Sequence, residues 1–172
     1  MSPAAQAGAL TGPSPLTQAH DLSRFNSGKP LLDDWLRNSA LVSEGRTARS
    51  YVVCEEKLAV VGYYCISTGS VERRDLPSKI KRARGMPKQV PVAIIGRLAR
   101  DQTYAGRGLG KDLLQDALKR ILAASQIIGV RAVLVHALDG DAVRFWKDHE
   151  FIECPIDSRT FYLPIETIAG AI

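Results

Sequence analysis

The sequence predicts an α+β fold: a single domain with a mixed, mostly antiparallel sheet. Three observations predict it. The chain has 172 residues, which suits one domain with a substantial core. Its first half contains two apolar runs rich in Val, Tyr and Ile that are joined by a short charged turn, as in a hairpin. Its second half alternates strand-like and helix-like segments, and this order predicts helices packed on a mixed sheet.

The expected elements follow in chain order. Segment 1–15 is rich in Ala, Gly, Ser and Pro and lacks periodicity, so we expect it to be flexible and the domain to span 16–172. A helix should begin near Pro30, since proline is favoured at the first helical position, and Gly45 should end it. The expected strands are 50–54, 58–68, 90–98, 130–138 and one or two within 151–163, and the other expected helices are 112–124 and 139–149.

Composition excludes several classes of protein. Apolar residues make up 45% of the chain and charged residues 24%, which is ordinary for a globular protein. No apolar run approaches the roughly 20 residues of a membrane helix, and the N-terminus lacks the pattern of a signal peptide. Cys54, Cys65 and Cys154 are scattered and have no histidine at metal-ligand spacing. We therefore expect buried thiols, no metal, no membrane and a cytoplasmic location.

The positive charge of the chain is concentrated in one segment. The formal net charge is +5, and segment 71–90 carries seven basic and two acidic side chains, which accounts for all of it. Its prolines and glycines predict an irregular excursion with at most a short helix. The basic residues are Arg73, Arg74, Lys79, Lys81, Arg82, Arg84 and Lys88.

A glycine-rich turn, Gly106-Arg107-Gly108-Leu109-Gly110-Lys111, lies between an expected strand and an expected helix. The first N–H groups of a helix lack internal partners, and the helix dipole favours negative charge there. Glycines allow positive φ and let phosphate oxygens reach the backbone. The turn therefore predicts a pyrophosphate cradle, and the alternative is a plain helix-capping loop.

Spacing excludes two common phosphate motifs at this turn. A nucleotide P-loop would require glycine where Ala105 stands and Ser or Thr where Asp112 stands. The dinucleotide fingerprint G-x-G-x-x-G fails as well, because the glycines are 106, 108 and 110.

The remaining pattern resembles the GNAT (Gcn5-related) N-acetyltransferases, in particular the toxins of toxin–antitoxin modules. The similarity covers roughly 16–163. The segments that carry it are Phe25-Asn26-Ser27-Gly28, Leu32-Asp33-Asp34-Trp35-Leu36, Val61-Gly62-Tyr63-Tyr64, Arg97-Leu98-Ala99, the glycine-rich turn, Gly129-Val130-Arg131-Ala132 and Val135-His136-Ala137-Leu138. The resemblance implies the GNAT fold, with a splayed central strand pair and flanking helices. It also implies acetylation of the α-amino group of aminoacyl-tRNA, arrest of translation, a dimer, and a ribbon-helix-helix antitoxin as partner.

The resemblance further implies where acetyl-coenzyme A binds. Its pantetheine would pair with the backbone near Leu98, Ala99 and Arg100, where an N–H can polarise the thioester carbonyl. Its pyrophosphate would lie on the turn, formed by Ala105, Gly106, Arg107, Gly108, Leu109, Gly110 and Lys111. Ala105 departs from the Gln or Arg that is usual in the family motif.

No histidine is a persuasive general base, and none is required. An α-amino group has a pKa of about 7.7–8.0, against about 10.4 for lysine, so a useful fraction of an aminoacyl amine is already neutral. His20 lies outside the motifs, His136 ends a strand where we expect a structural hydrogen bond, and His149 is expected to face solvent.

Trp146 departs from the family at the position of the acid. In the toxins a tyrosine in Phe-Tyr-x-x-x-Gly-Phe is thought to protonate the leaving thiolate, whereas this chain has Trp146 at the tyrosine and Glu150 at the glycine. An indole N–H donates a hydrogen bond but does not act as an acid at these pH values. Three interpretations remain: the thiolate leaves without an acid, which we favour; Tyr104 or another tyrosine substitutes; or the protein acts by binding.

The basic segment suits tRNA, because Lys and Arg neutralise phosphates in a largely sequence-independent way. The alternatives are a solvated loop or a docking face for an acidic antitoxin tail. Two other functions also remain open: acetylation of a small amine or a protein, and coenzyme binding without turnover. The basic segment argues against a cationic amine as substrate.

Overall fold

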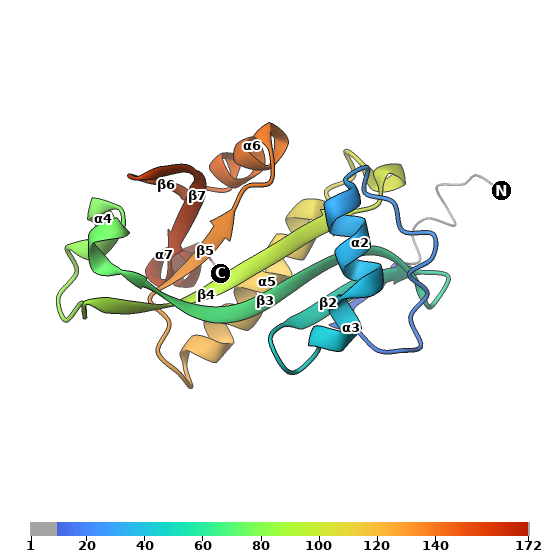
Figure 1. Cartoon of the computed structure of the whole chain (residues 1–172), viewed down its shortest axis with the longest axis horizontal. Coiled ribbons are helices and arrows are strands. Elements are labelled where there is room, and N and C mark those ends of the chain that lie inside the picture. Colours follow the sequence, from blue (N-terminus) through green and yellow to red (C-terminus); the bar gives the residue numbers. More distant parts are fainter. Residues whose placement is uncertain (1–9, 172) are drawn as a thin grey trace. The chain divides into compact units, whose positions relative to one another are not determined.

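The computed structural model describes residues 10–171 (Figure 1). These residues divide into two compact units. The first unit contains 10–67 and 97–117, and the second contains 68–96 and 118–171. Among the described residues, seven strands form a sheet in the order β1-β2-β3-β4-β5-β7-β6. Strands β3 (Ala59–Glu72) and β4 (Gln89–Arg100) and helix α5 (Leu109–Ser125) contribute residues to both units.

The first unit is built on antiparallel pairs. Strand β2 pairs with β1 on one side and with β3 on the other, with Tyr51 opposite Tyr64. Helix α2 covers one face of these strands, and its Leu36 side chain lies with Val52 and Tyr63 in a buried apolar cluster. The other elements of the unit are β1 (Thr11–Pro15), α2 (Pro30–Asn38), α3 (Ala40–Ser43), β2 (Arg49–Glu55) and the 3₁₀ turn η2 (Gln102–Tyr104).

Helix α5 packs on the opposite face of β3 in this unit. A Cβ at Gly62 would lie 3.1 Å from Leu113 Cδ1 and 3.4 Å from Leu109 Cδ2, so glycine permits the close approach of the helix. Because side chains alternate across a strand, Tyr63 then faces α2.

The second unit contains the parallel part of the sheet. Val92 through Ile95 of β4 pair with Ala132 through Val135 of β5, and β7 pairs antiparallel with both β5 and β6. Its buried cluster includes Leu76, Ile80, Val90 and Tyr162. Its other elements are η1 (Arg73–Asp75), α4 (Ser78–Lys81), β5 (Ala132–His136), α6 (Gly140–Asp148), β6 (Ile152–Cys154), β7 (Asp157–Pro164) and α7 (Ile165–Ala171).

The expected α+β class, the mixed sheet and the buried thiols are confirmed. The expectation of a flexible 1–15 is wrong for Thr11–Pro15, which form the edge strand β1; residues 1–9 lie outside the described part. An edge strand pairs through its backbone, so it needs no apolar periodicity that a sequence would display. Leu16, which follows it, is buried and donates its N–H to Ser50 O at 3.0 Å.

Two helix boundaries differ from expectation, and the structure contains one further helix. The first helix ends at Asn38, and the chain restarts as α3 after Ser39. Helix α5 begins at Leu109 rather than at residue 112, so half of the glycine-rich turn belongs to the helix. The short α7 was not predicted. Its residues, Ile-Glu-Thr-Ile-Ala-Gly-Ala, are too few for a helical period to be recognised.

Candidate active site

The glycine-rich turn is open and has the backbone conformation that glycine favours. Gly106 and Gly108 have φ of 74° and 80°, and nothing lies within 4 Å of the position that a Cβ would take at either residue. The amides of Leu109, Gly110 and Lys111 precede the first internal hydrogen bond that α5 can make. These N–H groups are therefore available to an anion at the helix N-terminus.

Two exposed cations flank this cradle. Arg107 lies with its guanidinium carbon 4.9 Å from the centroid of the Tyr104 ring, and Lys111 projects from the first turn of α5. Positive side chains, open glycines and unsatisfied amides together match the chemistry of a pyrophosphate. The turn thus fits the coenzyme that the sequence predicts.

Asp101 anchors the segment that leads into the turn. Its side chain is 8% exposed, and its Oδ1 accepts hydrogen bonds from the Thr103 amide at 3.0 Å and hydroxyl at 2.9 Å, which caps η2. Its Oδ2 accepts from the Asn26 amide at 2.9 Å, and its own amide donates to Val61 O at 2.7 Å. The end of β4 is therefore tied both to β3 and to the loop before α2.

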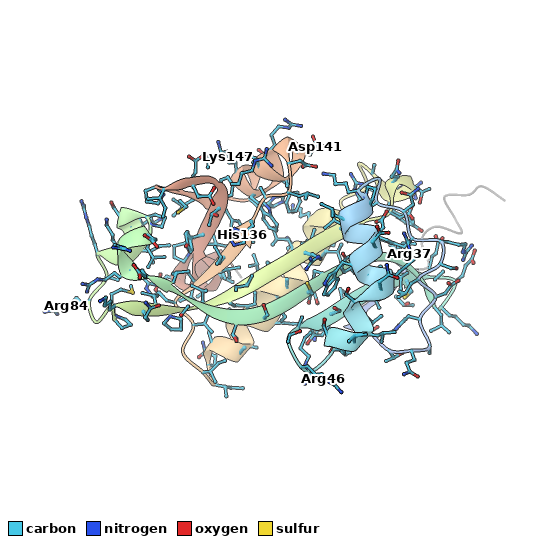
Figure 2. All side chains as sticks on the ribbon, viewed as in Figure 1. Arg37, Arg46, Arg84, His136, Asp141 and Lys147 are labelled. Carbon is cyan, nitrogen blue, oxygen red and sulfur yellow. The ribbon has the colours of Figure 1, made fainter. Side chains whose placement is uncertain are left out.

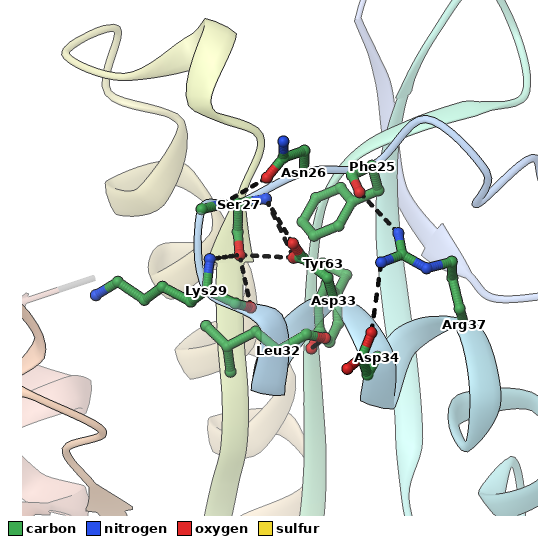
Figure 3. A network of polar contacts seen from close by, with 10 residues as sticks. Phe25, Asn26, Ser27, Lys29, Leu32, Asp33, Asp34, Arg37 and Tyr63 are labelled. Atoms are coloured by element: carbon green, nitrogen blue, oxygen red, sulfur yellow. Dashed lines mark hydrogen bonds and ion pairs between the residues drawn. The ribbon is translucent and has the colours of Figure 1, made fainter.

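The loop Phe25–Gly28 forms the other half of this anchor (Figure 3). The Asn26 carbonyl accepts from the Gln102 amide at 2.9 Å, and Asn26 Oδ1 accepts from the Gly28 amide at 2.9 Å. Asp33, 5% exposed in α2, accepts from the Ser27 hydroxyl at 2.6 Å and from the Ser27 amide. This network keeps the approach to the turn rigid, and spacing alone did not reveal it.

Tyr104 is fixed beneath the turn rather than free to act as an acid. It is 4% exposed, and its hydroxyl donates a hydrogen bond to Glu55 Oε2. Burial and the neighbouring Glu55 carboxylate raise the pKa of Tyr104 to about 12. The Tyr63 hydroxyl donates to Leu32 O, and the Tyr64 hydroxyl donates to Asp116. These three tyrosines are therefore poor substitutes for the family acid.

The residues predicted to pair with the pantetheine lie at the end of β4. Ala99 is buried in the cluster beneath α2, whereas Leu98 and Arg100 are half-buried. Pairing of β4 with β5 ends at Ile95 opposite Val135, and β4 continues to Arg100. This end of pairing agrees with the splayed strand pair that the resemblance implies.

Trp146 lies in the second unit, on α6. It is 6% exposed, and its ring lies 5.0 Å from the ring centroids of Phe145 and Phe151. Its carbonyl accepts from the His149 amide at 3.2 Å and from the Phe151 amide at 3.1 Å. The indole therefore has a packing role in this unit, and a catalytic role at this position stays a prediction.

The histidines make local hydrogen bonds. His136 Nδ1 lies 2.9 Å from the Thr160 hydroxyl, which donates to Asp157, so the expected hydrogen bond of His136 is confirmed. His20 Nδ1 accepts from the Thr17 amide at 3.0 Å. The expectation that His149 faces solvent is wrong, because it is half-buried against the Phe145 ring, with Nδ1 2.8 Å from Phe145 O.

The predicted basic segment forms an exposed surface on the second unit, which we call the basic surface. All seven predicted side chains are exposed, while Leu76, Ile80 and Val90 between them are buried. Figure 2 shows Arg84 pointing outward near the tip of the loop after α4. The basic surface consists of Arg73, Arg74, Lys79, Lys81, Arg82, Arg84 and Lys88.

Two of these residues have protein partners. Arg73 Nη1 donates to Met86 O at 3.0 Å, and Arg74 Nε lies 2.5 Å from Glu72 Oε2. Within residues 10–171, Lys81, Arg82 and Arg84 form no ion pair, so these three cations are available to a ligand.

The described part of the chain contains no group of three or more His, Cys, Asp and Glu side chains that could hold a metal ion. Among residues 10–171, none of the helices combines the length and apolarity needed to cross a bilayer.

Known proteins resemble this chain along most of its length. Residues 16–151 match the model of the acetyltransferase (GNAT) family. The chain belongs to the GNAT family. The tRNA-acetylating toxin of Mycobacterium tuberculosis (strain ATCC 25618 / H37Rv) is 41% identical over 148 residues, covering 86% of this chain and 87% of the relative. The probable toxin TacT of Sinorhizobium fredii (strain NBRC 101917 / NGR234) is 34% identical, covering 87% of both chains.

Several solved structures are similar to this chain over nearly its whole length. AtaT complexed with acetyl-methionyl-tRNAfMet has a TM-score of 0.87 and 29% identity, with coverage of 94% of this chain and 98% of AtaT. AtaTR bound with AcCoA has a TM-score of 0.82 and 30% identity, with coverage of 94% and 97%. A mutant AtaT bound to the C-terminus of the antitoxin AtaR has a TM-score of 0.81 and 27% identity, with coverage of 94% and 96%.

Proposed function

We propose that this GNAT protein is the toxin of a type II toxin–antitoxin module. It acetylates the α-amino group of aminoacyl-tRNA with acetyl-coenzyme A and thereby inhibits translation. The observation that carries the proposal is 41% identity, across 86% of the chain, to a tRNA-acetylating toxin. The open glycine-rich turn supports the same activity, because it has the chemistry of a coenzyme pyrophosphate site.

In this proposal the first unit holds the acetyl donor. The amides of Leu109, Gly110 and Lys111 bind the pyrophosphate, and Arg107 adds a cation that stacking on Tyr104 keeps in place. A backbone N–H among Leu98, Ala99 and Arg100 polarises the thioester carbonyl as negative charge develops on its oxygen. Acetyl-coenzyme A supplies the activated acetyl group.

The acceptor amine attacks in its neutral form. Its nitrogen forms a bond to the acetyl carbon, the carbon–sulfur bond breaks with its electron pair on sulfur, coenzyme A leaves as the thiolate, and the amine proton passes to solvent. Because the pKa of an α-amino group is about 7.7–8.0, this reaction needs no dedicated base near neutral pH. The local hydrogen bonds of His20, His136 and His149 are consistent with that.

The second unit supplies the contact to RNA. Exposed cations of the basic surface neutralise phosphates of aminoacyl-tRNA. The further partners that we propose are a ribbon-helix-helix antitoxin and a second copy of the chain. We also propose that the protein acts in the cytoplasm and binds neither a metal nor a membrane. The AtaT complex with its antitoxin supports such a partner. A short neighbouring reading frame that encodes a ribbon-helix-helix protein would agree with it.

The direct test is incubation with labelled acetyl-coenzyme A and tRNA. We expect label on charged tRNA and none on the same tRNA after mild deacylation, because only the charged form carries the α-amino group. If neither the charged nor the deacylated tRNA is labelled, and a small amine or a protein amine is labelled instead, aminoacyl-tRNA is not the substrate.

Trp146 favours a second candidate, a coenzyme-binding protein that is weakly active or inactive. The family tyrosine is absent there, and the hydroxyls of Tyr63, Tyr64 and Tyr104 are already donated within the protein. General acid catalysis typically contributes about 10²- to 10⁴-fold. Turnover without it would therefore be slower by up to this factor.

Exchange of Trp146 separates the two candidates. We expect Trp146→Tyr to raise acetylation turnover on aminoacyl-tRNA and to leave the Kd for acetyl-coenzyme A unchanged, because it restores an ionisable hydroxyl. Trp146→Phe is the matched control, since it removes the indole from the same buried position without adding a hydroxyl. Equal turnover of the two variants would contradict an acid role at this position.

A further inference from the structure

Arg97 of β4 is held on an aromatic platform in the first unit. Its guanidinium carbon lies 4.5 Å from the centroid of the Trp35 ring. Trp35 stacks in turn on Tyr63, with centroids 6.1 Å apart and an interplanar angle of 11°. Tyr63 is fully buried, and its hydroxyl donates to Leu32 O at 2.7 Å (Figure 3). The platform is therefore fixed, and the charge above it has a defined position.

Among the described residues, no carboxylate forms an ion pair with this guanidinium. Within residues 10–171, Arg97 forms no ion pair, and its half-buried side chain is in contact with solvent. The two acidic residues of α2 have other partners, since Asp33 accepts from Ser27 and Asp34 pairs with Arg37. The guanidinium carbon lies over the Trp35 ring, and the N–H groups that point away from the ring remain available for a contact with an anion.

The position of Arg97 indicates which anion this is. Arg97 directly precedes Leu98, where the proposed function places the acyl end of the coenzyme, and one strand residue advances the chain by only about 3.3 Å. Side chains alternate along β4, so Arg97 shares the α2 face with the buried Ala99. An anion bound there lies within a side chain's length of the acyl transfer.

The acceptor amine is carried by an ester on the terminal ribose of tRNA, and the charge nearest to it is the phosphodiester on the 5′ side of that nucleotide. We propose that Arg97, positioned by Trp35, binds this phosphodiester and so places the amine at the thioester. The inference rests on the proposed function, because it assigns a subsite of the same acceptor.

The test compares two acceptors that differ in this phosphate: aminoacyl-tRNA and aminoacyl-adenosine, which carries the same ester and amine without a phosphate. Arg97→Gln keeps a planar group on Trp35 but removes the charge. It should lower kcat/KM on aminoacyl-tRNA by about ten- to a hundredfold, as expected for one charged hydrogen-bonded contact. Activity on aminoacyl-adenosine and the Kd for acetyl-coenzyme A should stay at the wild-type values.

Two further variants sharpen the result. Arg97→Lys should recover part of the loss, because an ammonium retains the charge without the two-pronged geometry. Arg46→Gln is the matched control, since Arg46 is an exposed arginine of the same unit beyond α3 (Figure 2) and should have no effect. In Arg97→Gln, the slope of log Kd for tRNA against log salt concentration should also fall by roughly 0.7, which is the contribution of one single-stranded phosphate.

Equal loss on both acceptors would overturn the proposal and make Arg97 a structural residue. Weaker binding of acetyl-coenzyme A would assign Arg97 to a coenzyme phosphate instead, and no loss on either acceptor would also overturn the proposal. If the wild-type protein acetylates neither acceptor, the proposed function fails. The change in salt dependence of tRNA binding then still decides whether Arg97 contacts a phosphate.

Discussion

Reversal of three charges on the basic surface, with Lys81→Glu, Arg82→Glu and Arg84→Glu combined, is expected to abolish acetylation of aminoacyl-tRNA. These side chains are exposed and form no ion pair within residues 10–171, so their charge is available to phosphates. Each phosphate contact that is lost reduces the salt dependence of log Kd by about 1. We expect kcat/KM on aminoacyl-tRNA to fall roughly a hundredfold or more.

The Kd for acetyl-coenzyme A should not change in this variant, because the predicted coenzyme residues belong to the first unit. A matched control is the combination of Arg46→Glu, Lys57→Glu and Lys119→Glu, which changes the net charge equally at three other exposed positions. Equal loss in both triple variants would mean that net charge, and not this surface, supports binding. Full activity of the basic-surface variant would mean that the basic surface docks the antitoxin or is simply solvated, and does not bind tRNA.

Gly108→Val is expected to abolish acetyl-coenzyme A binding at concentrations that saturate the wild-type protein. The φ of 80° is strained for a β-branched residue, and the side chain would fill space that is now empty above the turn. Either effect moves the amides at the start of α5 away from the pyrophosphate. Isothermal titration with acetyl-coenzyme A measures the loss.

Gly85→Val is the control for backbone strain alone. Gly85 has a φ of 73° and, like Gly108, nothing within 4 Å of a Cβ position, but it lies in the loop after α4. In both variants the free energy of unfolding should fall by a similar amount, about 1–2 kcal/mol. Only Gly108→Val should lose binding of acetyl-coenzyme A. Unimpaired binding by Gly108→Val would reduce the turn to a helix cap.

Much of the fold was predictable because its signals are local. Pro30 marks the start of α2, the Val- and Tyr-rich runs mark β2 and β3, and the glycines mark the turn before α5. Strand β1 was missed because it pairs through its backbone and carries no apolar period. Helix α7 was missed because seven residues are too few to show one.

The site divides in the same way. Glycine spacing predicted the pyrophosphate turn, and charge counting predicted the basic surface. The supports of the turn come from distant parts of the chain. Asp101 and Asn26 are 75 residues apart and joined by a 2.9 Å hydrogen bond, and the Tyr104 hydroxyl reaches Glu55, 49 residues away. No periodicity connects such pairs, although Asn26 belongs to a segment that carries the family resemblance.

The sequence by itself determined the fold class, the family, the position of the glycine-rich turn and the location of the positive charge. Each of these depends on residue type and on short-range spacing, and the chain preserves both. Only the tertiary structure decided which functional groups already have hydrogen-bond or ion-pair partners within the protein. It removed Tyr104 as a candidate acid by burying its hydroxyl against Glu55, and it placed Arg97 on Trp35 without an acidic partner among the described residues. Availability depends on contacts between residues far apart in the chain, and folding alone creates these contacts.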